Sequence, residues 1–238
     1  MNASITLAAL AESIDAWFGV DEPTCLVQPR AKPVRRLGLA LDPWPGLSNW
    51  AAELALDAVF LHRHWRLDPR NCPGHIGVLA NHAGFDVRLG FGENPELLTA
   101  LGLRMESRLG ESRALGVVAT GAPRTINMLR ESLFGIFGGV EEELLPEAGQ
   151  AQRLIQRIAL ARAMRPGLIE NARAAGAQAY VTGQLRQPAR ASALATGMTV
   201  FAVGHRRSEQ WALKQLGMLL ARRWPALELY IASDTANA

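Results

Sequence analysis

Residues 37–62, LGLALDPWPGLSNWAAELALDAVFLH, decide the fold of this chain. Residues 37–41 form an apolar run that predicts a buried strand, and the prolines and glycine that follow predict a turn. Residues 47–56 have the spacing of a helix, and residues 57–62 predict a second strand. A β-α-β unit of this size implies parallel strand pairing, with helices that cover the sheet. The stretch therefore predicts an α/β fold.

The same alternation of elements continues along the chain. Ser4 is the expected N-cap of the first helix and Gly19 its end, and Asn94 or Gly92 is expected to open a later helix. A β-α-β-α-β pattern in the second half predicts two α/β lobes of similar topology, approximately residues 1–112 and 113–238, with a site between them. Further helices are predicted at 5–18, 95–101, 123–137, 166–175, 188–195 and 208–224, further strands at 75–82, 115–120, 158–163, 178–182, 198–202 and 227–231, and an acidic loop at 140–152.

The composition is that of an ordinary soluble globular protein, with 238 residues, 49% hydrophobic and 20% charged. The net charge of +3 comes from arginines interspersed with acidic residues. No basic run is present, so nucleic acid is not an expected partner. The two cysteines form neither a CxxC motif nor a disulfide framework. A signal peptide and a membrane-length apolar run are both absent from the sequence, which predicts a cytoplasmic protein with no membrane partner.

The placement of the histidines predicts a metal site. His62, His82 and His205 each lie at or just after the end of a predicted strand, and Asp86 and Glu209 follow His82 and His205 by four residues. This spacing places two side chains on one face of a helix. Open α/β sheets bind ligands at the carboxyl edge of their strands, so we expect these side chains to meet there. The chain has five histidines in all, His62, His64, His75, His82 and His205.

Imidazole and carboxylate ligands suit divalent Zn, Mn, Fe, Co or Ni. Asp86 and Glu209 are carboxylates that could bridge two such ions, and His82 could act as a general acid or base. Each pair also has a simpler interpretation. The His205 and Glu209 pair could be a solvated helix contact, and His82 could cap a turn with Asp86 as the N-cap of the next helix. His75 has no partner in the pattern and is interpreted as a surface residue, and the tryptophans are expected to pack in the core or at an interface.

Six motifs together resemble the NIF-three-like family, also called domain of unknown function thirty-four, whose members carry the name GTP cyclohydrolase I type 2 homolog. The resemblance extends from about residue 10 to residue 231, and its most specific parts are the H…D motif and the closing GH…E motif. The motifs are LALDPWP (39–45), DAVFLHRHW (57–65), ANHAGFD (80–86), PELLTALGL (95–103), AYVTGQ (179–184) and AVGHRRSE (202–209).

The resemblance implies two interlinked α/β lobes with two divalent metals between them, and a homohexamer built as a trimer of dimers. Carried over by motif, the metal ligands are His62, Asp86, His205 and Glu209, and His82 is a histidine that lies near the metals without binding them.

The sequence departs from the family pattern at two positions. Arg63 stands where the family has a second adjacent histidine, and Gln184 stands where the family has a glutamate after Thr-Gly. A guanidinium cannot bind a metal, so one of the two ions is in question. His64 could replace the lost ligand, because alternate residues of an extended strand point to one side. Arg63 could instead bind a substrate phosphate or carboxylate.

Two classes of function follow from these residues. The first is a metal-dependent hydrolase that acts on a small phosphorylated or nucleotide-like molecule, with one or two divalent ions per chain. The second is a non-catalytic, metal-binding oligomer that serves as a scaffold or interaction protein. An open coordination position beside His82 would favour the hydrolase.

Overall fold

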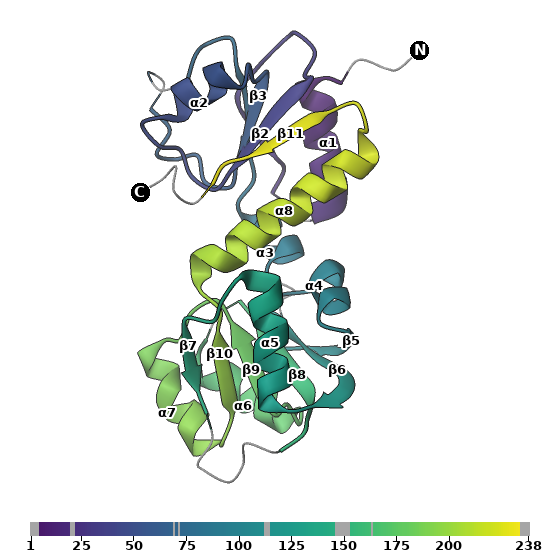
Figure 1. Ribbon diagram of the computed structural model, residues 1–238, viewed down its shortest axis with the longest axis vertical. Coiled ribbons are helices and arrows are strands. Elements are labelled where there is room, and N and C mark those ends of the chain that lie inside the picture. Colours follow the sequence, from purple (N-terminus) through teal and green to yellow (C-terminus); the bar gives the residue numbers. More distant parts are fainter. Residues whose placement is uncertain are drawn as a thin grey trace. The chain divides into compact units, whose positions relative to one another are not determined.

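A computed structural model describes residues 5–19, 22–68, 70, 72–111, 115–145, 153–162 and 164–233 (Figure 1). These residues form eight helices and eleven strands in two sheets, which confirms the predicted α/β class. The chain divides into two units. Unit 1 comprises Met1–Phe85 and Ala212–Ala238, and unit 2 comprises Asp86–Trp211. The units are thus divided differently from the approximate lobes 1–112 and 113–238.

The five-stranded sheet of unit 1 contains the predicted β-α-β element. Strand β2 (Arg36–Ala40) pairs in parallel with β3 (Ala58–Leu61), and α2 (Leu47–Glu53) connects them. Strand β4 (Gly77–Ala80) extends the parallel set on the far side of β3. Two strands complete the sheet, in the order β1-β4-β3-β2-β11: β1 (Cys25–Gln28), which is antiparallel to β4, and β11 (Glu228–Ile231), which is parallel to β2.

Helices cover both faces of this first sheet, as the buried parallel strands require. Leu47 and Ala51 of α2 pack against Val59 and Leu61 on one face. On the other face Leu7 of α1 (Leu7–Phe18) lies against β4. The α1 helix ends at Gly19 as predicted, in the left-handed conformation at φ +57°. Its N-cap is Thr6, whose hydroxyl accepts from the Ala9 N–H at 3.1 Å, whereas the expected Ser4 lies outside the described residues.

Gly38 allows α2 to approach the sheet closely. A Cβ atom at this position of β2 would lie 2.6 Å from two ring carbons of Trp50 and 2.7 Å from Leu56 Cδ1. Trp50 also packs against Trp44, with ring centroids 5.4 Å apart. Both rings lie against the core on this face of the sheet, so the predicted packing role of these two tryptophans is confirmed.

The six-stranded sheet of unit 2 has a parallel centre and antiparallel edges. Its order is β5-β6-β8-β9-β10-β7, and of these neighbouring pairs only β8–β9 and β9–β10 are parallel. The helices between these three strands confirm the β-α-β-α-β pattern predicted for the second half. The strands are β5 (Leu103–Arg108), β6 (Gly116–Arg124), β7 (Glu142–Leu144), β8 (Ile155–Ala161), β9 (Ala179–Thr182) and β10 (Thr199–Ala202).

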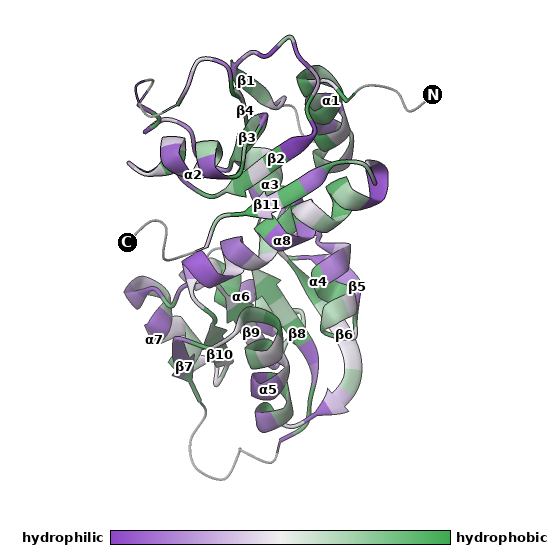
Figure 2. Cartoon of the chain, turned by 45° about the horizontal axis from the view of Figure 1, so that its top comes forward, coloured by the Kyte–Doolittle hydropathy of each residue, from purple (hydrophilic) through white to green (hydrophobic). Residues whose placement is uncertain are grey.

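Each face of the second sheet also has its own helices. Helices α4 (Pro95–Ala100) and α5 (Ile126–Phe137) share one core with the inward side chains of the strands. Helices α6 (Pro166–Ala174) and α7 (Gln187–Ala195) share the core on the opposite face. In Figure 2 the central strands β8 and β9 are coloured as hydrophobic, whereas α5 alternates between hydrophilic and hydrophobic colour. Asn94 is the N-cap of α4, its side chain accepting from the Leu97 N–H at 3.1 Å.

The structure corrects the sequence interpretation at several elements. The acidic segment predicted as a loop contains β7, which pairs antiparallel with β10. The last strand, β11, belongs to the sheet of unit 1 and not to that of the second half. Strands β1 and β5 and the short helix α3 (Ala83–Leu89) were not predicted. The last helix, α8 (His205–Arg223), begins three residues earlier than predicted.

Among the described residues, none of the helices combines the length and apolar character needed to cross a bilayer.

Candidate metal centre

The parallel register of unit 1 brings three strand ends to one edge of the sheet. Ala40, Leu61 and Ala80 are the last residues of β2, β3 and β4, and they are cross-strand neighbours in that order. The residues that follow each strand therefore emerge side by side at the carboxyl edge. His62 follows β3 directly, and its N–H donates to the Ala40 carbonyl at 3.0 Å. His82 follows β4 after one residue.

Three side chains at this edge could hold a metal ion. His62, His82 and Asp86 each offer a ligand atom, and these atoms all lie within 4.8 Å of one another. His62 is completely buried, and His82 and Asp86 are partly buried. The cluster consists of residues at two strand ends and in the first turn of helix α3.

Helix α3 places Asp86 by means of a cap that the sequence interpretation did not assign. The Asn81 side chain accepts from the Gly84 N–H at 2.9 Å and from the Phe85 N–H at 3.3 Å, which caps the helix. Asp86 is therefore in the first turn of α3 and is not its N-cap. His82 and Asp86 are four residues apart across this helix start, and the predicted convergence of the two side chains is confirmed.

The two histidine rings are held by aromatic packing. His62 stacks on His82 with ring centroids 4.6 Å apart and 22° between the planes, and the Phe85 ring lies 4.4 Å from His62. Trp65 lies 5.1 Å from the His82 ring, yet its side chain is 58% exposed. Trp65 is therefore not in the core, and the other predicted place for it, an interface, stays a prediction. An exposed indole beside the cluster offers a flat surface on which a planar ligand could stack.

Two arginines at the strand ends make ion pairs. Arg162, which follows β8, places Nη2 at 2.7 Å from the Asp86 carboxylate. Arg63 donates from Nε to Asp42 Oδ1 at 2.7 Å and from Nη2 to Asp42 Oδ2 at 3.2 Å. The Arg63 guanidinium is thus held by a carboxylate of the neighbouring strand end. Neither partner was assigned from the sequence, because the pairing depends on which strand ends are adjacent.

His64 does not belong to the three-residue cluster that the described residues form. Its ring lies 6.1 Å from that of Trp65, and β3 has already ended at Leu61. The alternation argument that would have pointed His62 and His64 to one side requires a continuing strand, which the chain does not provide here.

The His205 and Glu209 pair lies at the start of α8, as the four-residue spacing predicted. His205 Nε2 is 3.0 Å from Glu209 Oε1, with the histidine side chain 65% exposed and the glutamate side chain 7% exposed. Gly204 precedes the helix at φ +102°, which turns the chain from β10 into α8. The Ser208 hydroxyl donates to the His205 carbonyl at 2.6 Å. A carboxylate this deeply buried is either paired or bound to a metal, and here it faces an accessible imidazole.

The donor set of the cluster suits a divalent transition metal. Two imidazoles and one carboxylate are the ligands of many catalytic sites that keep a coordination position open, and no thiolate takes part. The ring nitrogens and the carboxylate oxygen are already close, so binding would not need a large rearrangement of these residues. His62, His82 and Asp86 therefore fit a metal ion.

The fold and this cluster define a class of mixed α/β proteins with two units and a candidate centre for a divalent metal. The model of the family Duf34/NIF3 (NGG1p interacting factor 3) matches residues 72–237, and the chain belongs to this family. The resemblance inferred from the six motifs is thereby confirmed.

Similar proteins agree with this assignment. A protein of Pseudomonas aeruginosa named GTP cyclohydrolase 1 type 2 homolog is 27% identical over 250 residues, which cover 96% of this chain and 97% of that protein. Reduced HcgD from Methanocaldococcus jannaschii has a TM-score of 0.74 and 18% identity, with 96% and 98% of the two chains covered. An NIF3 superfamily protein from Sphaerobacter thermophilus has a TM-score of 0.60 and 12% identity, with 97% and 99% covered. These two structures support the fold.

Proposed function

We propose that the protein binds a divalent metal through His62, His82 and Asp86 and acts as a metal-dependent hydrolase on a small phosphorylated or nucleotide-like molecule. The observation that carries the proposal is the convergence of these three side chains at the carboxyl edge of a parallel sheet. A divalent cation held there would supply Lewis-acid activation of a substrate oxygen. The name of the Pseudomonas relative suggests a nucleotide as substrate.

The surroundings of the cluster support a planar, anionic substrate. The exposed face of Trp65 could stack a base or another flat ring. The guanidinium of Arg162 is 40% exposed and could donate to a phosphate oxygen as well as to Asp86. Arg63 was predicted to receive the substrate anion, but its guanidinium is already shared with Asp42, so we propose Arg162 as the first anion contact and Arg63 as a secondary one.

His82 could be a metal ligand, or it could be an acid or base that does not bind the metal, and the two roles can be distinguished by experiment. The family resemblance implies an acid or base that does not bind the metal, whereas the grouping with His62 and Asp86 supports a ligand. If His82 is a ligand, His82→Ala should lower metal content together with activity. If His82 only moves protons, the variant should retain its metal and lose activity alone.

We further propose that His205 and Glu209 are metal ligands, as the motif resemblance implies. The number of ions, one or two, would depend on position 63, because a second ion would need a ligand in place of the histidine that Arg63 replaces. The assembly that the resemblance implies is a homohexamer, which sedimentation would reveal as six times the chain mass of 25.8 kDa.

The experiment that tests the proposal is metal analysis by mass spectrometry on protein purified without a metal-affinity tag. The wild type is expected to hold one metal per chain, and His62→Ala is expected to lose it. His75→Ala is the matched control, because His75 is exposed and lies outside the cluster. Metal retained in full by His62→Ala would contradict the site. Metal present without turnover of any phosphorylated or nucleotide substrate would favour the scaffold.

A further inference from the structure

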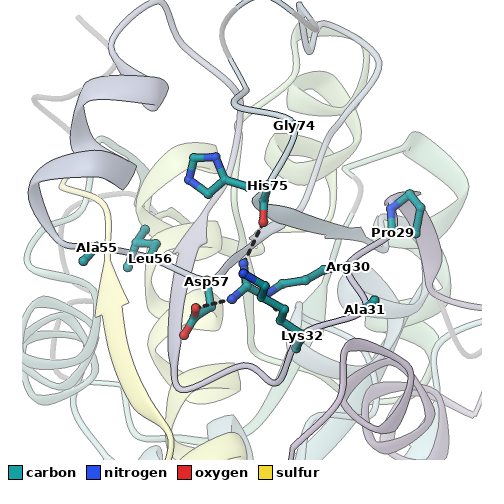
Figure 3. Close-up of a pocket in the computed structure, with 9 residues that line it drawn as sticks. All are labelled: Pro29, Arg30, Ala31, Lys32, Ala55, Leu56, Asp57, Gly74 and His75. Carbon is teal, nitrogen blue, oxygen red and sulfur yellow. Dashed lines mark hydrogen bonds and ion pairs between the residues drawn. The ribbon is translucent and has the colours of Figure 1, made fainter.

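A second pocket lies at the opposite edge of the first sheet from the histidine cluster. It has a volume of about 510 Å³ and is formed by the loop after β1, the turn between α2 and β3, and the turn before β4 (Figure 3). Because β3 begins at Ala58 and β4 at Gly77, the pocket faces the amino ends of these strands. All of its residues belong to unit 1.

An ion pair between Arg30 and Asp57, whose charges cancel, lies at the centre of the pocket. Arg30 Nη2 donates to Asp57 Oδ1 at 2.5 Å, and the Arg30 and Asp57 side chains are 11% and 22% exposed. The other Asp57 oxygen accepts from the N–H groups of Arg35 and Arg36 at 2.8 and 3.1 Å. Arg30 also donates to the His75 carbonyl at 2.6 Å, as the dashed lines of Figure 3 show. The one carboxylate of the pocket is therefore fully engaged and cannot repel an anion strongly.

One ammonium group and one imidazole group of the pocket remain available to a ligand. Lys32 and His75 are exposed, and within the described part of the chain neither side chain makes a hydrogen bond or an ion pair. The charge of Arg30 cancels that of Asp57, so Lys32 gives the pocket a net positive charge. Lys32 is one of only two lysines in the protein.

The turn before β4 adds backbone donors. The Ile76 N–H donates to the Pro73 carbonyl at 2.9 Å and closes a turn with Gly74 and His75 at its centre. Among the described residues the N–H groups of Gly74 and His75 donate to no other group. Unsatisfied N–H groups beside a cationic side chain are the usual partners of phosphate oxygens.

We propose that this pocket binds a phosphomonoester of a small organic molecule. The phosphate oxygens accept hydrogen bonds from the Lys32 ammonium, the His75 imidazole and the N–H groups of the turn. The organic part lies against the apolar side formed by Leu56 and Ala55, which contributes no hydrogen-bonding side chain. The site is separate from the proposed metal centre and does not depend on it.

The test is calorimetric titration of metal-free full-length protein with glycerol phosphate and, separately, with inorganic phosphate. Wild type is expected to bind both. Lys32→Ala and His75→Ala should each weaken binding by about tenfold or more, as expected for a lost hydrogen bond to a charged group. Lys214→Ala, at the other lysine, should bind as wild type does.

The proposal and the metal centre can fail separately. Binding that survives in His62→Ala but is lost in Lys32→Ala locates the phosphate in this pocket. Binding that is lost in His62→Ala and unchanged in Lys32→Ala and His75→Ala would overturn the proposal, as would the absence of binding to wild type. Both pocket side chains are exposed and make no hydrogen bond or ion pair with any described residue, so these variants should keep the thermal stability of the wild type.

Discussion

Arg162 competes with a metal ion for the carboxylate of Asp86. The guanidinium lies 2.7 Å from the Asp86 carboxylate, and the two side chains are 40% and 13% exposed. A cation that binds the Asp86 carboxylate must share it with the Arg162 guanidinium or displace that guanidinium. The positive charge of the arginine also repels the cation. Replacing Arg162 by glutamine is therefore expected to tighten metal binding.

The size of the effect follows from the geometry. Two charges about 4 Å apart interact by about 4 kcal/mol at the effective dielectric constant of about 20 that suits sites near a protein surface. The exposure of Arg162 reduces this figure, and measured partly exposed pairs contribute about 1 kcal/mol. Since about 1.4 kcal/mol corresponds to a tenfold change, Arg162→Gln should increase metal affinity by about fivefold.

The assay is calorimetric titration of chelator-treated protein with zinc or manganese. Arg157→Gln is the matched control, because Arg157 lies on β8, the strand that Arg162 follows, is 43% exposed, and makes an ion pair of the same 2.7 Å length with Glu106. The control should leave metal affinity unchanged. Weaker or equal binding in Arg162→Gln would refute the competition and would mean that the arginine orients Asp86 for the metal. An equal increase in both variants would show a general effect of net charge.

Three predictions concern the frame that holds the site. Gly38→Ala should destabilise the protein by about 1–3 kcal/mol in urea unfolding, since its Cβ would overlap the α2 side chains; unchanged stability would contradict the close approach. Ala55 is at φ +47°, so Ala55→Gly should raise the free energy of unfolding by up to about 1 kcal/mol. Ala52→Gly, at an exposed position of α2, should lower it by a similar amount. Burial raises the pKa of the Cys72 thiol, so at any pH it is less ionised than a free thiol; thiol reagents should label exposed Cys25 first and Cys72 only on unfolding.

The parts of the site that were predicted are those set by local pattern. Apolar runs located β3 and β4, and a parallel pair must end at a common edge, so the meeting of His62 and His82 followed from spacing alone. Asp86 followed from its spacing of four residues after His82, although helix α3 itself was not predicted. These inferences needed no knowledge of distant contacts.

The parts that were missed depend on tertiary pairing. Nothing near Arg162 in sequence indicates that it meets Asp86, because that contact joins the end of β8 to α3. The sequence of β7 begins with two glutamates, which is typical of a solvated loop. As an edge strand, however, β7 pairs with only one neighbour, β10, and its charged side chains can stay exposed. Strand β11 was placed in the wrong sheet, because its pairing with β2 spans most of the chain.

This pairing has a consequence for the order in which the chain can fold as it leaves the ribosome. Unit 2 is one continuous segment, Asp86–Trp211, and all six of its strands have been synthesised before β11. Unit 1 begins first but finishes last, because β2 keeps one edge unpaired until Glu228–Ile231 arrives. The nascent protein therefore carries an open strand edge through most of its translation, at the stage when aggregation is most probable.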